Sequence, residues 1–523
     1  MRDFQLPGRS AVLSMNGMAA TSHPLGTKVA IQMLEAGGNA LDAAIAGALL
    51  LGTAEPQMTG IGGDCFALIS RPGEAPIAMN GSGRAPAAFD AEALRAAGHS
   101  AMPRTGAQSV TIPTAVDAFC RLNKDHGRMG LGDVIGPAVY HAEAGIPVAP
   151  RVARDWTEAS HLNDAAQRKL MPGGKPLTTG TVFREPGVAE ALRRLAVEGR
   201  AGFYEGEVAE DMVDTLRGLG GAHSLDDFAQ ARAEYTTPVT TAYGAHEVME
   251  HPPNGQGATA LLLLNILKQF DLSAMDPFGA ERAHIEAEAT KLAYDARNRF
   301  LADPDHMTRL EHMLAPETAA RLAALIRPDA VLPPGLPGAG EAHKDTIYIT
   351  VVDRDRMAVS LIYSIFRTFG SGVASDKFGI LLQNRGAGFT LEKGHANEAA
   401  PGKRPMHTII PGLLRKDGET VMPFGVMGGQ YQANGHARFV TNLLDFGLSP
   451  QAAIDGPRSF ATDGVLQVER GYPDAVRNAL SDLGHQVEVP DGPIGGAQAI
   501  RIHESGVLEG ASDPRKDGCA LGY

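Results

Sequence analysis

One threonine of this chain stands where an N-terminal nucleophile would stand. Thr346 opens the alternating run of residues 346–353 and follows the Pro/Gly-rich residues 331–343. A cut between Asp345 and Thr346 would give Thr346 a free α-amine beside its own hydroxyl. Because an α-amine has a pKa near ~7.7–8.0, it can take the hydroxyl proton near neutral pH. The alternative is an ordinary β-branched strand residue, which Thr346 taken alone fits better.

A pair of glycines offers a partner for such a nucleophile. Gly428 and Gly429 follow the predicted strand at residues 421–427. Two successive N–H groups can point at one place and stabilise an oxyanion there. A simple tight turn is the alternative reading of the pair.

Four more polar residues stand in loops that could line a pocket. Arg84 lies in Gly-Ser-Gly-Arg-Ala-Pro, and Arg385 lies in Gln-Asn-Arg-Gly. A guanidinium can hold a carboxylate with two parallel hydrogen bonds. His407 and Thr408 follow Lys-Arg-Pro-Met and could add polar groups. The alternatives are two surface arginines and a turn or capping pair.

The elements around these residues predict an α+β protein. Helices are predicted at residues 27–35, 40–51, 258–267, 280–301 and 437–444. Strands are predicted at residues 65–70, 75–80, 346–353, 357–365, 379–383 and 421–427, with a strand pair around 240–249. Since helices and strands do not alternate regularly, the order favours α+β layers over a doubly wound parallel sheet.

Composition narrows the functional classes. The 523 residues are 44% hydrophobic and 20% charged, which is ordinary for a globular protein long enough for a large core. The formal net charge of -13 gives no reason to expect binding to nucleic acid or to an anionic membrane.

The cysteines and the apolar stretches give no sign of a disulfide framework, a metal site or a membrane span. The three cysteines, Cys65, Cys120 and Cys519, form neither a disulfide framework nor a metal-ligand pattern, and buried small side chains are the simpler interpretation. The longest apolar stretch, residues 43–53, is too short to span a bilayer. The first ten residues show no secretory signal, so a cytoplasmic protein is expected.

Short motifs occur in one order along nearly the whole chain, at residues 20–25, 37–44, 55–56, 60–63, 112–116, 203–206, 252–253, 288–294, 403–405 and 513–518. This ordered set resembles the γ-glutamyltranspeptidase family of N-terminal-nucleophile hydrolases. The resemblance implies a four-layer αββα sandwich formed by two chains cut from one precursor. Residues 1–345, with a linker near 331–345, would form the large chain, and residues 346–523 the small one.

The resemblance also assigns roles. Thr346 would be the nucleophile of self-cleavage at Asp345–Thr346 and of turnover, with Ser364 orienting it and Gly428 and Gly429 forming the oxyanion hole. Arg84 matches the arginine that binds the substrate carboxylate. Neither a metal nor an organic cofactor is implied. The partners would be a small amide substrate and the other half of the cut chain, with homo-oligomers left open.

The chain departs from the family pattern around the substrate. Ile347 replaces a second threonine, Ser364 replaces the orienting threonine, and Phe366 stands where the family has a substrate-binding asparagine. Arg385 replaces a polar or acidic residue after the paired asparagines. Gly388 replaces the aspartate that holds the γ-glutamyl ammonium.

The paired serines of the family become His407 and Thr408. An ammonium needs a carboxylate or several acceptors, which these positions no longer supply. The pocket is therefore expected to prefer a small anionic acyl group without an ammonium, as in the oxamate amidohydrolase-like branch. A true γ-glutamyl hydrolase or transpeptidase acting on glutathione, and a non-catalytic binding protein with the same fold, are the two alternatives.

Overall fold

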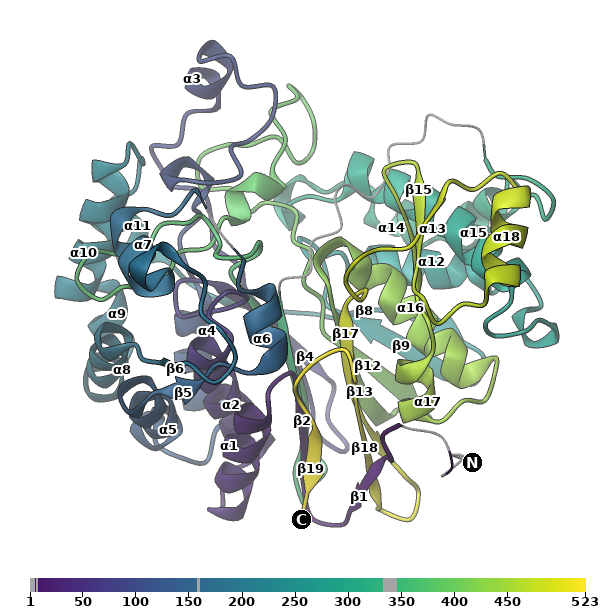
Figure 1. Cartoon of the computed structure of the whole chain (residues 1–523), viewed down its shortest axis with the longest axis horizontal. Coiled ribbons are helices and arrows are strands. Elements are labelled where there is room, and N and C mark those ends of the chain that lie inside the picture. Colours follow the sequence, from purple (N-terminus) through teal and green to yellow (C-terminus); the bar gives the residue numbers. More distant parts are fainter. Residues whose placement is uncertain (1–4, 6–7, 158–159, 333–345) are drawn as a thin grey trace.

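The computed structural model describes residue 5 and residues 8–157, 160–332 and 346–523. Two antiparallel sheets lie face to face in the middle of the molecule, and helices cover the outer face of each (Figure 1). This four-layer arrangement confirms the predicted αββα sandwich. Residues 333–345 of the predicted linker, which include Asp345 of the predicted cleavage site, lie outside the described residues.

The first sheet has seven strands, all paired antiparallel. In spatial order they are β1 (Val12–Ser14), β18 (Leu508–Ser512), β17 (Gly496–Ile502), β13 (Glu419–Met427), β12 (Gly412–Lys416), β9 (His246–Glu250) and β8 (Val239–Tyr243).

The second sheet also has seven antiparallel strands. Their order is β19 (Ala520–Gly522), β2 (Met18–Thr21), β10 (Ile347–Val352), β11 (Ala358–Ser364), β3 (Asp64–Ser70), β4 (Ile77–Gly81) and β7 (Glu234–Thr236). Smaller sheets join β14 (Ser459–Thr462), β15 (Val465–Val468) and β16 (Val487–Glu488), and β5 (Ile146–Pro147) with β6 (Val182–Phe183).

One helical layer covers the second sheet, on the left of Figure 1. It and its surroundings contain α1 (Pro24–Glu35), α2 (Ala40–Ala54), α3 (Ala91–Ala96), α4 (Ala115–His126), α5 (Leu131–Ala144), α6 (Pro150–Asp155), α7 (Asp164–Leu170), α8 (Pro186–Glu198), α9 (Ala201–Tyr204), α10 (Gly206–Gly218) and α11 (Leu225–Gln230).

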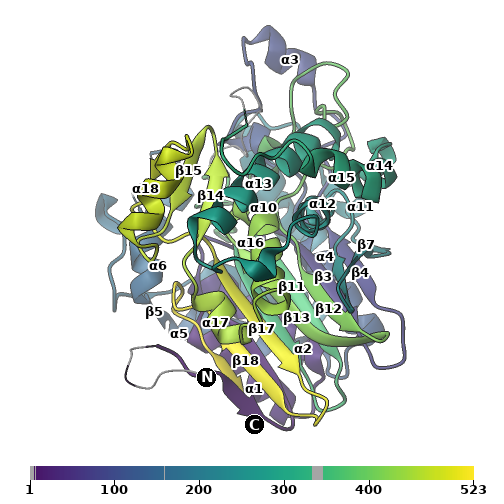
Figure 2. The same cartoon turned by 90° about the vertical axis from the view of Figure 1, so that its right-hand side faces the viewer.

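The other helical layer covers the first sheet and faces the viewer in Figure 2. It contains α12 (Gly257–Leu267), α13 (Ala280–Phe300), α14 (Leu310–Leu314), α15 (Pro316–Ala323), α16 (Gln432–Leu444), α17 (Pro450–Asp455) and α18 (Asp474–Asp482). Helix α12 is buried along its whole length, because it packs on β8 and β9 and is covered by α13, α15 and α16.

The central strand β10 is buried on both faces because each sheet face has a partner layer. Ile347, Ile349 and Val351 join the core beneath α2, while Tyr348 points into the space between the sheets. Gly425 of β13 lies under the Tyr348 ring, and a Cβ there would approach Tyr348 Cε2 to 2.3 Å. The two sheets are therefore closely packed against each other near the start of β10.

The predicted elements are largely present, with one clear error. No strand forms at residues 379–383, where only isolated bridges occur, from Leu381 to Ala374 and from Leu382 to Gly62. The apolar run there is buried as irregular chain instead, held by contacts with two separate segments. Among the described residues, no helix is long and apolar enough to cross a membrane. The cytoplasmic location stays a prediction.

Candidate active site

Three polar residues form a row across neighbouring strands of the second sheet, at one end of its central strands β10, β11 and β3. Ile347 of β10 pairs with Tyr363 of β11, so Thr346 and Ser364 stand at the next position of the ladder. Ser364 pairs in turn with Asp64, the first residue of β3. All three side chains are buried, with exposures of 1% or less. Sheet register alone therefore brings a threonine, a serine and a carboxyl group together.

The hydroxyl of Thr346 is held by its neighbour. Thr346 Oγ1 donates to Ser364 Oγ at 3.4 Å, a long hydrogen bond, and Ser364 Oγ also accepts from Phe366 N–H at 2.8 Å. Phe366 is buried with a φ of 82°, which is strained for a bulky residue. Such strain persists only where the surroundings enforce it, which is common at functional sites.

A buried guanidinium lies beside this row. Arg385 has no exposed surface, and its side chain lies over the Phe366 ring at 4.3 Å and donates from Nη1 to Thr408 Oγ1 at 3.1 Å. Its Nε and Nη2 atoms have no hydrogen-bond partner among the described residues. Burial lowers the pKa of Arg385 to about 9, against the opposing effect of Asp64. A cation with unmet donors in a buried place is suited to hold an anion.

The backbone around Arg385 is fixed in two ways. Gln383 accepts from Arg385 N–H at 2.7 Å and donates to Thr111 Oγ1 at 2.6 Å. Gly386 lies so close to Ser109 that a Cβ would approach Ser109 O to 2.7 Å. The guanidinium of Arg385 is thus positioned by the hydrogen bonds of Gln383 on one side and by the close packing of Gly386 on the other.

Asp64 and His407 form a buried acid–imidazole pair. His407 Nε2 lies 3.3 Å from Asp64 Oδ2, and neither side chain is exposed. Burial raises the pKa of Asp64 to about 7, although Arg385 and the N–H groups of Thr114 and Gly83 act against this. Burial, assisted by Arg385, lowers the pKa of His407 well below its usual value, so this ring is neutral. Asp64 therefore changes charge near neutral pH next to Arg385.

The two glycines stand where the first sheet ends. Gly428 follows β13 with a φ of 125°, and Gly429 has a φ of 55°. A Cβ on Gly428 would approach Gly495 Cα to 2.9 Å. None of the hydrogen bonds found among the described residues uses the N–H of Gly428 or of Gly429. Their oxyanion role stays a prediction.

Arg84 is engaged elsewhere. Its guanidinium lies 3.3 Å from Glu234 and 3.5 Å from Asp303, and it donates to Gly402 O at 3.0 Å. Among the described residues, none of its interactions reaches Thr346, Ser364 or Arg385. The structure brings Ser364, Phe366, Arg385, His407 and Thr408 into one connected group, but not Arg84, whose substrate-binding role stays a prediction.

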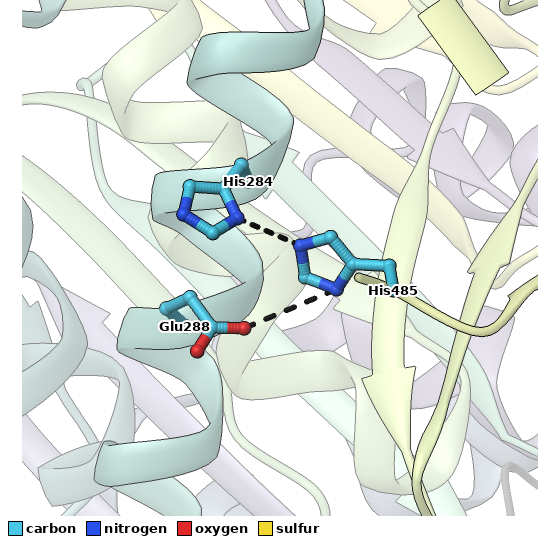
Figure 3. A group of neighbouring side chains, drawn as sticks. All are labelled: His284, Glu288 and His485. Atoms are coloured by element: carbon cyan, nitrogen blue, oxygen red, sulfur yellow. Dashed lines mark hydrogen bonds and ion pairs between the residues drawn. The ribbon is translucent and has the colours of Figure 1, made fainter. Parts of the chain in front are cut away.

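A second polar cluster has the side chains of a metal site. His284 and Glu288 of α13 and His485 each offer one atom within 4.8 Å of the others (Figure 3). However, His284 Nδ1 lies 2.8 Å from His485 Nε2, and Lys291 Nζ lies 2.5 Å from Glu288 Oε1. Because hydrogen bonds and an ammonium already use these atoms, the cluster is a hydrogen-bonded clasp.

Sequence reasoning missed Asp64. A signal was available, because an aspartate between Gly62-Gly63 and the apolar run 65–70 can only be carried into the sheet with that run. A buried carboxyl needs partners, and these come from residues 83, 114 and 407, which no local pattern connects.

The sequence is similar to known proteins along nearly its whole length. The family model for gamma-glutamyltranspeptidase matches residues 26–523. The chain is 36% identical to the glutathione hydrolase-like YwrD proenzyme of Bacillus subtilis, over 98% of this chain and 99% of that one. It is 35% identical to the oxamate amidohydrolase proenzyme of Klebsiella pneumoniae, over 98% and 100% of the two chains.

A solved structure shows the same likeness in three dimensions. The cephalosporin acylase from Bacillus halodurans superposes with a TM-score of 0.91 at 37% identity, covering 100% of this chain and 99% of that one. Sequence motifs, sheet topology and these matches agree from end to end. The chain belongs to the γ-glutamyltranspeptidase family of N-terminal-nucleophile enzymes.

Proposed function

We propose that this protein is an autoprocessing amide hydrolase that works through an acyl group on Thr346. The observation that carries the proposal is the buried Thr346 Oγ1–Ser364 Oγ hydrogen bond at the first position of β10. Relatives of similar length are called proenzymes, which supports cleavage before Thr346 into chains of 345 and 523 − 345 = 178 residues. The two chains would remain associated, because β10 is hydrogen-bonded to β2 of the other chain.

Turnover then follows from the groups in place. Thr346 Oγ attacks the amide carbonyl and its new α-amine takes the proton. The N–H groups of Gly428 and Gly429 stabilise the oxyanion while the C–N bond breaks and the amine leaves with a proton. Water then hydrolyses the ester and releases the carboxylic acid.

The acyl group is a small one that carries a carboxylate. Arg385 is the support for this choice. Its buried Nε and Nη2 donors have no partner in the part of the chain that the structure describes, and its guanidinium lies over the Phe366 ring. Among the described residues, Asp64 is the one carboxylate found to act on Arg385, so an α-ammonium placed here would meet the guanidinium. An oxamate-like amide fits this environment, and Arg84 is a second candidate for binding its carboxylate.

A true γ-glutamyl hydrolase is the alternative, favoured by the name of the Bacillus subtilis relative at 36% identity. Parallel kinetics with oxamate and with γ-glutamyl-p-nitroanilide separate the two. Our proposal predicts a higher kcat/KM for oxamate and no stimulation by an acceptor dipeptide. Efficient, acceptor-dependent release of p-nitroaniline would contradict it.

A further inference from the structure

A buried glutamine bonds to both parts of the proposed active site. Gln256 stands directly before α12 and has no exposed surface. Its Nε2 donates to Gly429 O at 3.1 Å and to Thr408 O at 2.6 Å. Gly429 lies in residues 428–431, the predicted oxyanion turn, and Thr408 Oγ1 accepts from Arg385. One amide group therefore joins this turn to the residues proposed to bind the acyl group.

A buried arginine sets the orientation of the Gln256 amide. Arg297 of α13 is 2% exposed, and its Nη1 donates to Gln256 Oε1 at 3.0 Å. Turning the amide over would place its NH2 group against this guanidinium and its oxygen against two carbonyl oxygens. The Nε2 donor of Gln256 is thus kept on the side of Gly429.

Arg297 and its neighbour Tyr294 also reach the oxyanion turn directly. Arg297 Nη1 donates to Gln430 Oε1, and the Tyr294 hydroxyl donates to Gln430 O. The Arg297 guanidinium lies over the Tyr294 ring at 4.4 Å. Helix α12 packs on both α13 and α16, and α16 begins directly after the turn (Figure 2). Side chains from α13 and from the start of α12 therefore fix two successive residues of the turn.

The oxyanion turn needs support from outside its own backbone. Gly428 and Gly429 have φ values of 125° and 55°, and successive glycines leave a chain free to take other conformations. N–H groups stabilise an oxyanion well only when they are already in place before the charge develops. The bond from Gln256 to Gly429 O limits the directions in which this part of the turn can point.

We infer that Gln256 and Arg297 are positioning residues for catalysis, which fix the oxyanion turn relative to the residues that bind the acyl group. The inference rests on the proposed function and deepens it, because neither side chain meets the substrate and both act through Gly429 and Gln430. Both residues come from the predicted large chain, whereas the turn belongs to the small one. The network therefore also joins the two predicted chains at the site.

Gln256→Glu tests the inference with little change in shape. The carboxylate still accepts from Arg297 but has no donor for Gly429 O and Thr408 O. Because the oxyanion exists only in the transition state, we expect kcat for oxamate to fall about thirtyfold and KM to stay nearly unchanged. The same fall in kcat is expected with γ-glutamyl-p-nitroanilide, since both amides form the same kind of oxyanion. Steady-state kinetics on the processed protein measures both constants.

Arg297→Lys tests whether the two residues act together. An ammonium keeps the charge but lacks the planar fork that bonds to Gln256 and Gln430 at once, so kcat should fall about tenfold. In the double variant the two losses should not multiply, because both changes break one network. Losses that multiply in full would overturn the shared role.

Gln451→Glu is the matched control. Gln451 of α17 is also buried, and its side chain bonds to Asp455 and to both backbone groups of Ser512. This variant should lose stability in denaturant unfolding and keep its kcat. An equal fall in kcat for Gln451→Glu and Gln256→Glu would overturn the inference, because general destabilisation would then explain both.

Hydrogen–deuterium exchange separates this inference from the proposed function, since it needs no turnover. We expect residues 428–434 to exchange faster in Gln256→Glu than in the wild type. Unchanged exchange there, or a raised KM with unchanged kcat, would overturn the inference and leave the proposed function standing. Faster exchange in a protein whose wild type hydrolyses neither oxamate nor γ-glutamyl-p-nitroanilide would support the positioning of the turn and count against the proposed function.

Discussion

At the scale of single residues, the proposed binding of the substrate's acyl group depends on the buried guanidinium of Arg385. We expect Arg385→Gln to lower kcat/KM for oxamate about a hundredfold, because a buried charged hydrogen-bonded pair is lost. Arg385→Lys should restore little, since an ammonium keeps the charge but lacks the planar fork. Steady-state kinetics checks both variants.

Arg84→Gln is the matched comparison for Arg385→Gln. Arg84 is engaged by Glu234 and Asp303, so its loss should cost less activity than the loss of Arg385. If Arg84→Gln proved far more damaging and Arg385→Gln nearly harmless, the carboxylate would bind at Arg84, as the family resemblance alone implies.

We expect Asp64 to make substrate binding depend on pH. Burial raises its pKa to about 7, so it is neutral below this pH and anionic above it. The ionised carboxylate competes with an anionic substrate for Arg385, whereas the neighbouring His407 stays neutral. We expect KM for oxamate to rise about tenfold from pH 6 to pH 8, of the order expected for a nearby charge. In Asp64→Asn the profile should be flat, and an unchanged slope would refute this role.

The raised pKa of Asp64 also makes the stability of the protein fall as the pH rises. The folded-state pKa of Asp64 is raised above its usual value of 3.8. Its contribution to the free energy of unfolding is therefore complete below about pH 3.8 and is lost as the pH rises through 7. Asp64→Asn should remove this part of the pH dependence.

At the scale of elements, the turn between β13 and α16 needs glycine. Gly428→Ala would place a Cβ 2.9 Å from Gly495 Cα at a φ of 125°. We expect a loss of about 1–3 kcal/mol in the free energy of unfolding. We also expect kcat to fall about a hundredfold, because an oxyanion donor is misplaced.

Gly447→Ala is the control for the turn. Gly447 also has a positive φ, 62°, but nothing lies within 4 Å of a Cβ placed there. This variant should lose some stability in denaturant unfolding and keep its kcat. Equal kcat losses in the two variants would show that Gly428 has no special part in catalysis.

The sequence predicted these elements well where periodicity was strong and poorly where contacts were distant. The runs that became β10 and β11 alternate clearly, and α13 repeats its apolar residues at helical spacing, so their positions could be predicted to within a residue or two. Residues 379–383 look like a strand but find no strand to pair with. The link from Asp64 to His407 spans more than three hundred residues, and only the assembled sheets reveal it.

At the scale of the whole molecule, the clasp of His284, Glu288 and His485 joins the two predicted chains. Burial lowers the pKa of His485 to about 3, assisted by Lys291 and His284. The ring is neutral in the folded protein, so its contribution to stability is present above pH 6.5 and is lost as the pH falls toward 3.

This clasp gives a prediction about acid stability. The stability of the wild-type protein, measured by thermal unfolding, should fall more steeply from pH 7 to pH 4 than that of His485→Gln, because the variant has no ring to protonate. His312→Gln removes an exposed histidine of α14 and should behave as wild type. Identical slopes for wild type and His485→Gln would contradict this account of the clasp.

The central claim is that Thr346 cuts the chain before itself and then carries the acyl group. Denaturing mass spectrometry of the purified protein measures this most directly. We expect two chains from the wild type, the smaller of 178 residues beginning at Thr346, and a single intact chain without activity from Thr346→Ala. A wild-type chain that stays whole on long incubation, or a Thr346→Ala protein cut at the same bond, would contradict the account.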